Sequence, residues 1–375
     1  MSRQTTEILK AALSALHRSG MARMARPFTS GDGVILMLHH VTPEPARAFD
    51  PNRSLKVTPE FLDTVIQEVR AQGFEIISLD DVPSRLKDRG DGDKPFAVFT
   101  LDDGYKDNRD FAYPVFKRHG VPFTIYVPST YADGEGDLWW LMLETALQRL
   151  EAVTVALDGD ERAYSLANDR EKTAAFHDIY WSLRKMPERD ARAVVNGLAA
   201  QAGIDGHALC RDLIMSWDEI RALARDPLVC IGAHTCNHMA LAKLPDEEAR
   251  QEMAESIARI ERELGRPCRH FSYPYGDEGS AAEREFEIAR ELGVETAVTT
   301  RKGLLYAPHA DALTALPRLS LNGHYQDVRY LSALLSGLPF ALRDGVKSVL
   351  TPVKAGARKL SGRDAATRPA SASTR

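Results

Sequence analysis

The chain has 375 residues, of which 44% are hydrophobic, 27% charged and 7% aromatic. This length suits one large α/β domain or two ordinary ones, and the composition excludes a disordered, fibrous or membrane-spanning protein. No apolar run approaches the roughly 20 residues that a membrane helix needs.

The net charge of −5 is unevenly spread along the chain. Residues 1–30 contain five Lys or Arg against one acidic residue, residues 341–375 contain eight against two, and the body from 31 to 340 therefore carries −15. An acidic body argues against nucleic acid as a partner, because binding phosphates requires clustered Lys and Arg. It favours a substrate that is neutral or cationic.

Residues 1–30 are predicted to form a basic amphipathic segment. Its apolar residues fall on one stripe of a helix, formed by Ile8, Leu9, Ala12, Leu13 and Leu16. The stripe either contacts an anionic membrane surface or packs against the main domain. Charged residues interrupt the apolar run that a signal peptide needs, so we expect none, and we expect a cytoplasmic location or peripheral attachment at the inner membrane face. The basic tail, residues 341–375, is predicted to be disordered.

Between these ends, short β-branched or apolar runs alternate with amphipathic helical stretches, which is typical of a parallel sheet built from β-α units. Capping residues mark helix ends at Thr58, at Ser216 with Glu219, and at Gly265. Seven or eight strands that each precede a helix favour a (β/α) barrel over residues 31–340. These strands are predicted at 34–38, 74–79, 96–101, 122–127, 228–232, 270–273, 296–300 and 316–321.

Residues 133–214 interrupt this alternation. They show no convincing pair of buried strands and are predicted to form a helical insertion, with several helices around residues 153–157. Trp139 and Trp140 begin the insertion within an apolar run. Adjacent tryptophans in such a run favour a role as core anchors, with stacking against sugar rings as the alternative.

Two carboxylates follow the predicted strand 96–101. Asp102 and Asp103 stand where barrel enzymes keep their active sites, at the carboxyl end of a parallel strand, and Gly104 permits a sharp turn. Adjacent carboxylates that leave a buried strand are costly without a nearby cation or strong donors. Because Asp-Asp-Gly is also a common turn, the motif alone does not establish a site.

Two histidines four residues apart follow the predicted strand 228–232. His234 and His238 can place both imidazoles on one side of a helical turn and bind a metal, or each can be a structural residue. With a carboxylate they form a three-ligand set that leaves coordination positions open for water and substrate, as hydrolytic zinc sites require. The two strand-end motifs together favour a metal site.

A third strand-end motif, Tyr273-Pro274-Tyr275, could supply backbone N–H groups that hold an oxyanion. In this order, the three motifs resemble those of the polysaccharide deacetylase family, the NodB-homology domain of carbohydrate esterase family 4. The resemblance covers roughly residues 33–337, and the insertion is matched least. It implies a deformed (β/α) barrel of about seven parallel strands that removes N-acetyl groups from amino-sugar polymers with a divalent metal, usually zinc (Zn2+).

The resemblance also implies roles for individual residues. Asp102 matches the family's catalytic base, and Tyr275, preceded by Pro274, matches the motif whose backbone N–H helps to hold the oxyanion. The family's metal ligands are matched by Asp103, His234 and His238. General chemistry agrees: zinc polarises the amide carbonyl and lowers the pKa of its water towards about 7, a carboxylate takes the proton, and an acid protonates the leaving amine.

In the commonest family pattern, this acid comes from a Leu-x-x-His motif near the C-terminal end of the domain. This chain has no good match to that motif. His324 has the spacing, in Leu321-Asn322-Gly323-His324, but lies in a predicted loop. Residues 34–41 are similar to the first strand of a permuted branch of the family, the biofilm poly-N-acetylglucosamine deacetylases, in which a His after that strand is the acid. We therefore predict His39 rather than His324 as the acid, and a structural or exposed role for His40.

A second departure concerns Ser272, which replaces an arginine that orients the catalytic Asp in many family members. Arg318 could reach the carboxylate of Asp102 from a later strand and take over this role, or it could form an ordinary surface ion pair.

The sequence thus predicts a metal-dependent hydrolase that removes N-acetyl groups from amino-sugar oligomers or polysaccharides. A hydrolase of the same fold that acts on a non-carbohydrate amide or an O-acetyl ester would need the same residues. Ser272 and the missing C-terminal His motif suggest a third reading, a non-catalytic glycan-binding relative. This reading is disfavoured, because a binding module has no need for Asp102 beside a metal.

Overall fold

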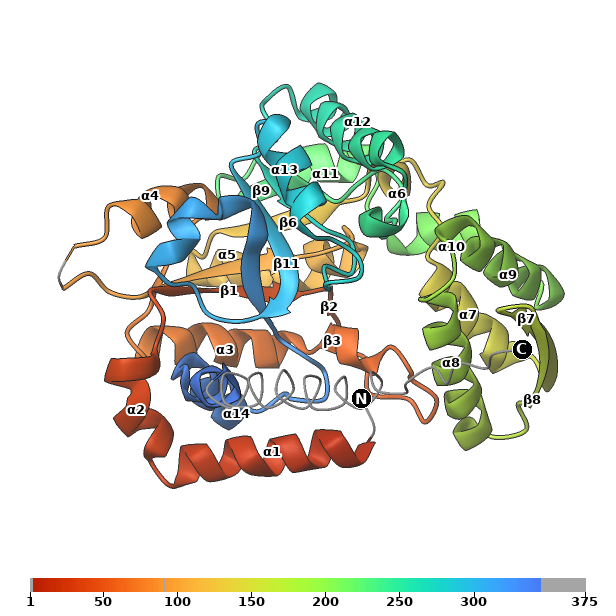
Figure 1. Cartoon of the computed structure of the whole chain (residues 1–375), viewed down its shortest axis with the longest axis horizontal. Coiled ribbons are helices and arrows are strands. Elements are labelled where there is room, and N and C mark those ends of the chain that lie inside the picture. Colours follow the sequence, from red (N-terminus) through yellow and green to blue (C-terminus); the bar gives the residue numbers. More distant parts are fainter. Residues whose placement is uncertain (1–2, 91, 345–375) are drawn as a thin grey trace, which may run out of the picture.

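The computed structural model describes residues 3–90 and 92–344, and its centre is a closed barrel of seven parallel strands (Figure 1). The strands are β1 (Gly33–Leu38), β5 (Phe96–Leu101), β6 (Phe123–Val127), β9 (Val229–Ala233), β10 (His270–Ser272), β11 (Thr296–Lys302) and β12 (Leu316–Ser320). Around the barrel the order is β1, β12, β11, β10, β9, β6 and β5, and pairing between β5 and β1 closes it. The predicted barrel of about seven parallel strands is confirmed.

The barrel is irregular on one side. The predicted strand 74–79 is reduced to β4 (Glu75–Ile76), which pairs with the first residues of β5, whereas β6 pairs with its last residues. The register of β11 against β12 also shifts, between Val298 and Lys302. By contrast, β1 and β5 pair over six residues and are buried along their whole length. Both strands are continuous apolar runs, which are typical of strands covered on both faces.

Helices pack around the barrel, and several begin or end where capping residues predict. Thr58 caps the first of them by accepting a hydrogen bond from the N–H of Phe61, Ser216 and Glu219 form a capping box, and Gly265 adopts the left-handed conformation that ends a helix. The helices are α3 (Pro59–Ala71), α4 (Val82–Lys87), α5 (Tyr113–His119), α6 (Ser129–Ala132), α11 (Trp217–Leu223), α12 (Asp246–Leu264), α13 (Glu283–Glu291) and α14 (Val328–Leu335), and a small parallel pair is formed by β2 (His40–Val41) and β3 (Lys56–Val57).

Residues 133–214 lie beside the barrel and have a hydrophobic core of their own (Figure 1). Most of this insertion is helical, in α7 (Trp139–Arg149), α8 (Asp169–Leu183), α9 (Glu188–Gln201) and α10 (Gly206–Leu213). Trp139 and Trp140 are buried in its core, as predicted.

The prediction of helices around residues 153–157 is wrong. There, β7 (Ala152–Leu157) and β8 (Asp160–Ser165) form an antiparallel hairpin. Burial alternates along β7, as in a strand with one covered face, and the turn at Asp158 and Gly159 has positive φ at both residues, which suits a tight hairpin turn.

Two helices precede the barrel, α1 (Arg3–Arg18) and α2 (Met21–Thr29), and α1 lies along α14 (Figure 1). Leu13 and Ala22 are buried in a small cluster with Ala333 of α14, whereas Ile8 and Leu9 are exposed. The predicted apolar stripe therefore divides between the main domain and the solvent. From residue 345 onward, the predicted tail lies outside the described residues. No helix in the described ranges is both long enough and apolar enough to cross a lipid bilayer.

Candidate metal site and active site

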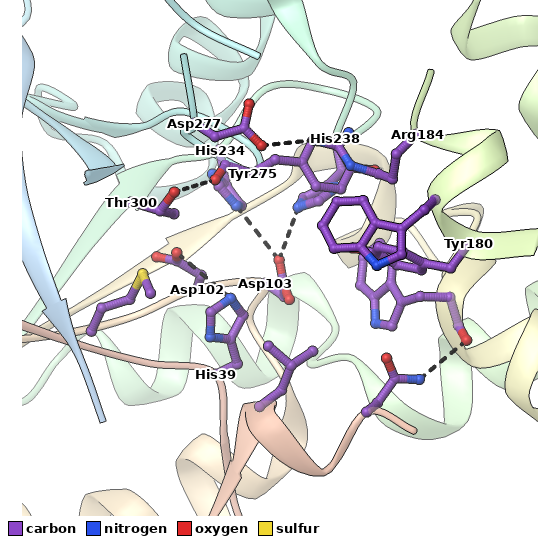
Figure 2. A pocket seen from close by; sticks show the side chains of 15 residues that line it. His39, Asp102, Asp103, Tyr180, Arg184, His234, His238, Tyr275, Asp277 and Thr300 are labelled. Carbon is purple, nitrogen blue, oxygen red and sulfur yellow. Dashed lines mark hydrogen bonds and ion pairs between the residues drawn. The ribbon is translucent and has the colours of Figure 1, made fainter. Parts of the chain in front are cut away.

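The carboxyl ends of the barrel strands open into a pocket of about 220 Å3, which the insertion borders on one side (Figure 2). The loops after β1, β5, β9 and β10 contribute His39, Asp102, Asp103, His234, His238 and Tyr275 to its lining. The insertion contributes Trp140, Tyr180, Trp181 and Arg184. Residues that are far apart in the sequence thus meet in one cavity.

Three buried side chains, those of Asp103, His234 and His238, converge in this pocket (Figure 2). The Nε2 atoms of His234 and His238 lie 3.5 and 3.3 Å from Oδ1 of Asp103. One potential ligand atom from each residue lies within 4.8 Å of the others. One carboxylate and two imidazoles are a ligand set found in hydrolytic zinc sites.

The surroundings of this trio fit a cation. Nδ1 of His234 lies 2.6 Å from the carbonyl oxygen of Ser272, which can only accept, so the neutral ring carries its proton on Nδ1 and turns the lone pair of Nε2 toward Asp103. Oδ1 of Asp103 is buried and has no hydrogen-bond partner among the described residues. The lone pair and the carboxylate oxygen repel each other, and a divalent metal between them would remove that repulsion.

Burial and charge set protonation states that suit metal binding. Burial lowers the pKa of His238 to about 4, so its imidazole is neutral at pH 7. A neutral imidazole and an ionised carboxylate are the forms that bind a metal.

The backbone around the pocket adopts left-handed conformations that residues other than glycine rarely take. Positive φ occurs at Asp103 (74°), Thr235 (63°), His238 (54°) and Tyr275 (60°), four of the five such residues in the described part of the chain. Each costs of the order of 1–3 kcal/mol and persists only where the surrounding structure enforces it. Oγ1 of Thr235, for example, accepts a hydrogen bond from the N–H of His238 at 2.9 Å.

Asp102 lies next to the metal ligands and pairs with Arg318 of β12. Nη1 and Nη2 of Arg318 each donate to one carboxylate oxygen at 2.7 Å, and Nη2 also donates to Oγ of Ser272 at 3.0 Å. Both charged side chains are buried. Burial alone would raise the pKa of Asp102, but the charge and hydrogen bonds of Arg318 outweigh it and lower this pKa. Asp102 is therefore ionised and held in a fixed orientation.

The remaining candidate histidines lie in different places. His39 lines the pocket with its Nε2 at 4.0 Å from Oδ2 of Asp102, and burial lowers its pKa. His40 lines a neighbouring cavity, where its Nδ1 lies 2.7 Å from Oδ2 of Asp107. His324 lines a third cavity, beside α1.

The segment after β10 brings Tyr275 against the metal ligands. Its ring packs edge-on against His238 with 4.8 Å between ring centroids, and its hydroxyl accepts a hydrogen bond from Nε1 of Trp139 at 2.7 Å. Oγ1 of Thr300 donates to the carbonyl oxygen of Tyr275. The Tyr275 N–H has no hydrogen-bond acceptor among the described residues, which leaves it available to a ligand. The preceding residue, Pro274, is buried.

Sequence reasoning missed the contribution of α8 to the pocket. Figure 2 shows Tyr180 and Arg184 across the cavity from His39 and Asp102. No motif marks these residues, because α8 has the spacing of an ordinary amphipathic helix. The one available signal is Trp181, a large apolar side chain outside the buried stripe of that helix.

Comparisons with known proteins agree with one another. A family model described as polysaccharide deacetylase matches residues 89–297. The Streptococcus pyogenes deacetylase PplD in complex with acetate is 16% identical, with a TM-score of 0.54 over 80% of this chain and 97% of that chain. IcaB from Ammonifex degensii is 17% identical, with a TM-score of 0.51 over 82% of this chain and 97% of that chain. BC0361, a polysaccharide deacetylase from Bacillus cereus, is 14% identical, with a TM-score of 0.51 over 81% of this chain and 68% of that chain. At these identities the likeness shows the fold. No curated protein matches the chain.

Proposed function

The chain belongs to the polysaccharide deacetylase family, and from this premise we propose that it is a metal-dependent hydrolase that removes N-acetyl groups from amino-sugar oligomers or polysaccharides. The observation that carries the proposal is the buried trio of Asp103, His234 and His238 with the ionised Asp102 directly beside it. A purely structural cluster would not need a second buried carboxylate with an arginine of its own. Zn2+ is the candidate ion, because carboxylate and imidazole ligands suit it.

When bound, a divalent ion supplies Lewis-acid chemistry, polarising the amide carbonyl and lowering the pKa of water. In our proposal Asp102 is the general base, and Arg318 keeps it ionised and oriented so that it can take a proton from the attacking water. The N–H of Tyr275 donates to the oxyanion that develops as the water oxygen adds to the carbonyl carbon. Pro274 fixes the backbone just before this donor.

His39 is our candidate for the acid that protonates the leaving amine. Its Nε2 lies 4.0 Å from the carboxylate of Asp102, so a proton taken up by the base has a short path to the imidazole. The C–N bond breaks as the nitrogen accepts this proton, and acetate and the free amine leave. We therefore also propose that the chain belongs to the permuted branch, in which the acid follows the first strand, and that His324 has no catalytic role.

The test is acetate release from N-acetylglucosamine oligomers by the purified protein. We expect no activity after metal removal, recovery with zinc, and a loss of at least about 100-fold in kcat in Asp102→Asn. Asp63→Asn, which alters a carboxylate on α3 outside the pocket, is the matched control and should behave like the wild type. Wild-type rates in Asp102→Asn would refute the proposal.

The same assay separates the alternative functions. Zinc-dependent cleavage of other amides or of O-acetyl esters, without release from N-acetylated sugars, would identify a hydrolase of this fold with another substrate. Binding of zinc and glycans without cleavage of any substrate would identify a non-catalytic relative.

We also propose that the N-terminal helices contact an anionic membrane surface, at the inner face of the cytoplasmic membrane. Their spacing places Met21, Met24 and Phe28 on one face of α2. Five of the nine exposed large apolar side chains in the described residues lie on these two helices, namely Ile8, Leu9, Met21, Met24 and Phe28. An apolar face within a basic segment suits a leaflet that contains anionic lipids.

A further inference from the structure

The loop that contains both candidate histidine ligands, residues 234–238, has an unfavourable backbone conformation. Thr235 and His238 have φ values of 63° and 54°, in the left-handed region, which costs of the order of 1–3 kcal/mol for a residue other than glycine. None of the loop's residues belongs to a helix or a strand, so no regular pattern of backbone hydrogen bonds fixes it. Its conformation therefore depends on side chains that bind its peptide groups.

Glu252 of α12 binds N–H groups of this loop. Its side chain is buried, and Oε2 accepts hydrogen bonds from the N–H of Cys236 at 3.0 Å and from that of Asn237 at 2.9 Å. Hydrogen bonds from backbone N–H groups to a carboxylate are stronger than those between neutral groups. One side of the loop is thus held by a helix that packs on the barrel.

Arg192 of α9 binds the loop from the insertion, through carbonyl groups. Its Nη2 donates to the carbonyl oxygens of Asn237 at 3.2 Å and His238 at 3.1 Å. Its Nη1 donates to the carbonyl oxygen of Asp137, near the start of the insertion, at 2.6 Å. Arg192 is 8% exposed. A single buried guanidinium therefore joins the insertion to the peptide groups of a candidate metal ligand.

A close ion pair does not account for this buried arginine. The carboxylate of Glu188, one turn earlier on α9, lies 4.0 Å from Nη2 of Arg192 and is also paired with Lys243 at 3.4 Å. Burying a guanidinium costs free energy, and an apolar side chain at the same position would avoid that cost. The contribution of Arg192 thus lies in its hydrogen bonds to carbonyl groups.

We propose that Arg192 is a positioning residue that fixes His238 for metal binding, so that the helical insertion is part of the metal site. The carbonyl groups of Asn237 and His238 belong to the two peptide units on either side of the His238 Cα atom. Because each unit is planar, holding both of them fixes φ and ψ of His238 and hence the direction of its side chain. The inference rests on the proposed metal site and gives the insertion a role in it.

The experiment measures metal binding by the full chain without turnover. Competition with a chromophoric chelator gives the Kd for Zn2+, and the visible absorption spectrum of the Co2+-loaded protein reports the geometry of the ligands. In Arg192→Met we expect the Kd to rise about 10–100-fold and the Co2+ spectrum to change. Arg192→Lys, which can still donate to carbonyl oxygens, should recover part of both. Asp103→Asn, which removes a candidate ligand, identifies any zinc that binds elsewhere.

Arg189→Met is the matched control, because it removes an exposed arginine from the same helix. Arg189 pairs with Glu248 of α12 at 2.8 Å and does not contact the loop, so this variant should keep the wild-type Kd and spectrum. Thermal unfolding of the metal-free proteins separates a general loss of stability from a loss of metal affinity. A wild-type Kd and a wild-type Co2+ spectrum in Arg192→Met would overturn the inference, even if its metal-free form unfolds at a lower temperature.

The remaining outcomes also decide the inference. If Arg192→Met does not fold, Arg192→Lys takes its place, and a wild-type Kd and spectrum in that variant would overturn the inference. Absence of zinc binding by the wild type would overturn it together with the metal site. If the wild type binds zinc but releases no acetate, and Arg192→Met weakens this binding, the deacetylase function fails and the positioning role of Arg192 stands.

Discussion

Arg318 is a buried guanidinium whose donors are directed to acceptors from several barrel strands. Its Nε donates to the carbonyl oxygen of Thr299, its Nη1 to Thr100 and Asp102, and its Nη2 to Asp102 and Ser272. A buried two-point ion pair of this kind is strongly destabilised when one partner is removed, because the other charge stays buried and unpaired.

Replacing this arginine should therefore affect both activity and stability. In Arg318→Met we expect the pKa of Asp102 to rise, kcat/KM to fall at least about 100-fold at pH 7, and the free energy of unfolding to fall by about 3–5 kcal/mol. Acetate release as a function of pH and urea denaturation measure the two effects. Arg318→Lys keeps the charge but not the two-point contact, so its kcat/KM and its free energy of unfolding should lie between those of the wild type and those of Arg318→Met. Wild-type rates in Arg318→Met would show that Asp102 needs no such partner.

A second buried charge, on His270, should make stability depend on pH. Oδ1 of Asp80 lies 3.0 Å from Nε2 of His270. Burial alone would lower the pKa of His270, but Asp80 and Cys230 outweigh burial and raise this pKa to about 9. Because the folded-state pKa is raised above the unfolded value of about 6.5, the stabilisation is complete below pH 6.5 and is lost as the pH rises to about 9.

We expect the wild type to lose about 2–3 kcal/mol of unfolding free energy between pH 6 and pH 9.5 through this group. Urea denaturation at the two pH values should show a smaller loss in His270→Gln. His119→Gln, which alters a histidine paired with Asp63 on the surface of α3, is the control. Equal losses in the wild type and in His270→Gln would contradict the prediction.

Much of the candidate site could be predicted from single residues, because parallel strands bring their carboxyl ends to one edge. That rule alone predicts that Asp102, Asp103, His234 and His238 lie together. The contact of Arg318 with Asp102 spans 216 residues, and only the serine at position 272 suggested it. The wall formed by α8 could not be predicted, because Trp181, the one signal on this helix, does not show which cavity the helix face borders.

At the scale of elements, continuous apolar runs predicted the barrel strands well, because strands covered on both faces need apolar residues throughout. The hairpin β7–β8 was missed because only one of its faces is covered. Buried and exposed residues therefore alternate along β7 instead of forming a continuous apolar run. The Asp158-Gly159 turn is the local signal that identifies it. The length of β4 was overestimated because apolar side chains continue on both sides of its two paired residues.

The exposed faces of α1 and α2 allow a direct test of membrane contact. Replacing Met24 and Phe28 together by serine should reduce cosedimentation with phosphatidylserine-containing vesicles by about tenfold or more, because burying one such side chain contributes about 1.5–3 kcal/mol. Phe111→Ser, which removes an exposed phenylalanine elsewhere, is the control, and vesicles of neutral lipid should bind the wild type weakly. Unchanged cosedimentation of the double variant would show that these helices do not bind the membrane.

For the whole molecule, zinc should act as a link between distant parts of the barrel, because its candidate ligands follow β5 and β9. At a free zinc concentration 100 times its Kd, we expect about 2.7 kcal/mol of stabilisation and a Tm several degrees higher. Thermal unfolding of Asp103→Asn should show no such shift, whereas the control Asp107→Asn should keep it. A full shift in Asp103→Asn would place the bound zinc elsewhere, for example at Asp80, Cys230 and His270, which also lie within 4.8 Å of one another.

The closure of the barrel by β12 has a consequence for synthesis on the ribosome. Asp102 emerges 216 residues before Arg318, which corresponds to roughly 10–40 s at 5–20 residues per second. Until then one edge of β1 lacks its neighbour β12, and the carboxylate of Asp102 has no guanidinium beside it. The nascent domain must therefore stay open and hydrated at this seam until almost all of it has been translated. During that interval the bare edge of β1 is the surface that chaperones would have to shield from other nascent chains.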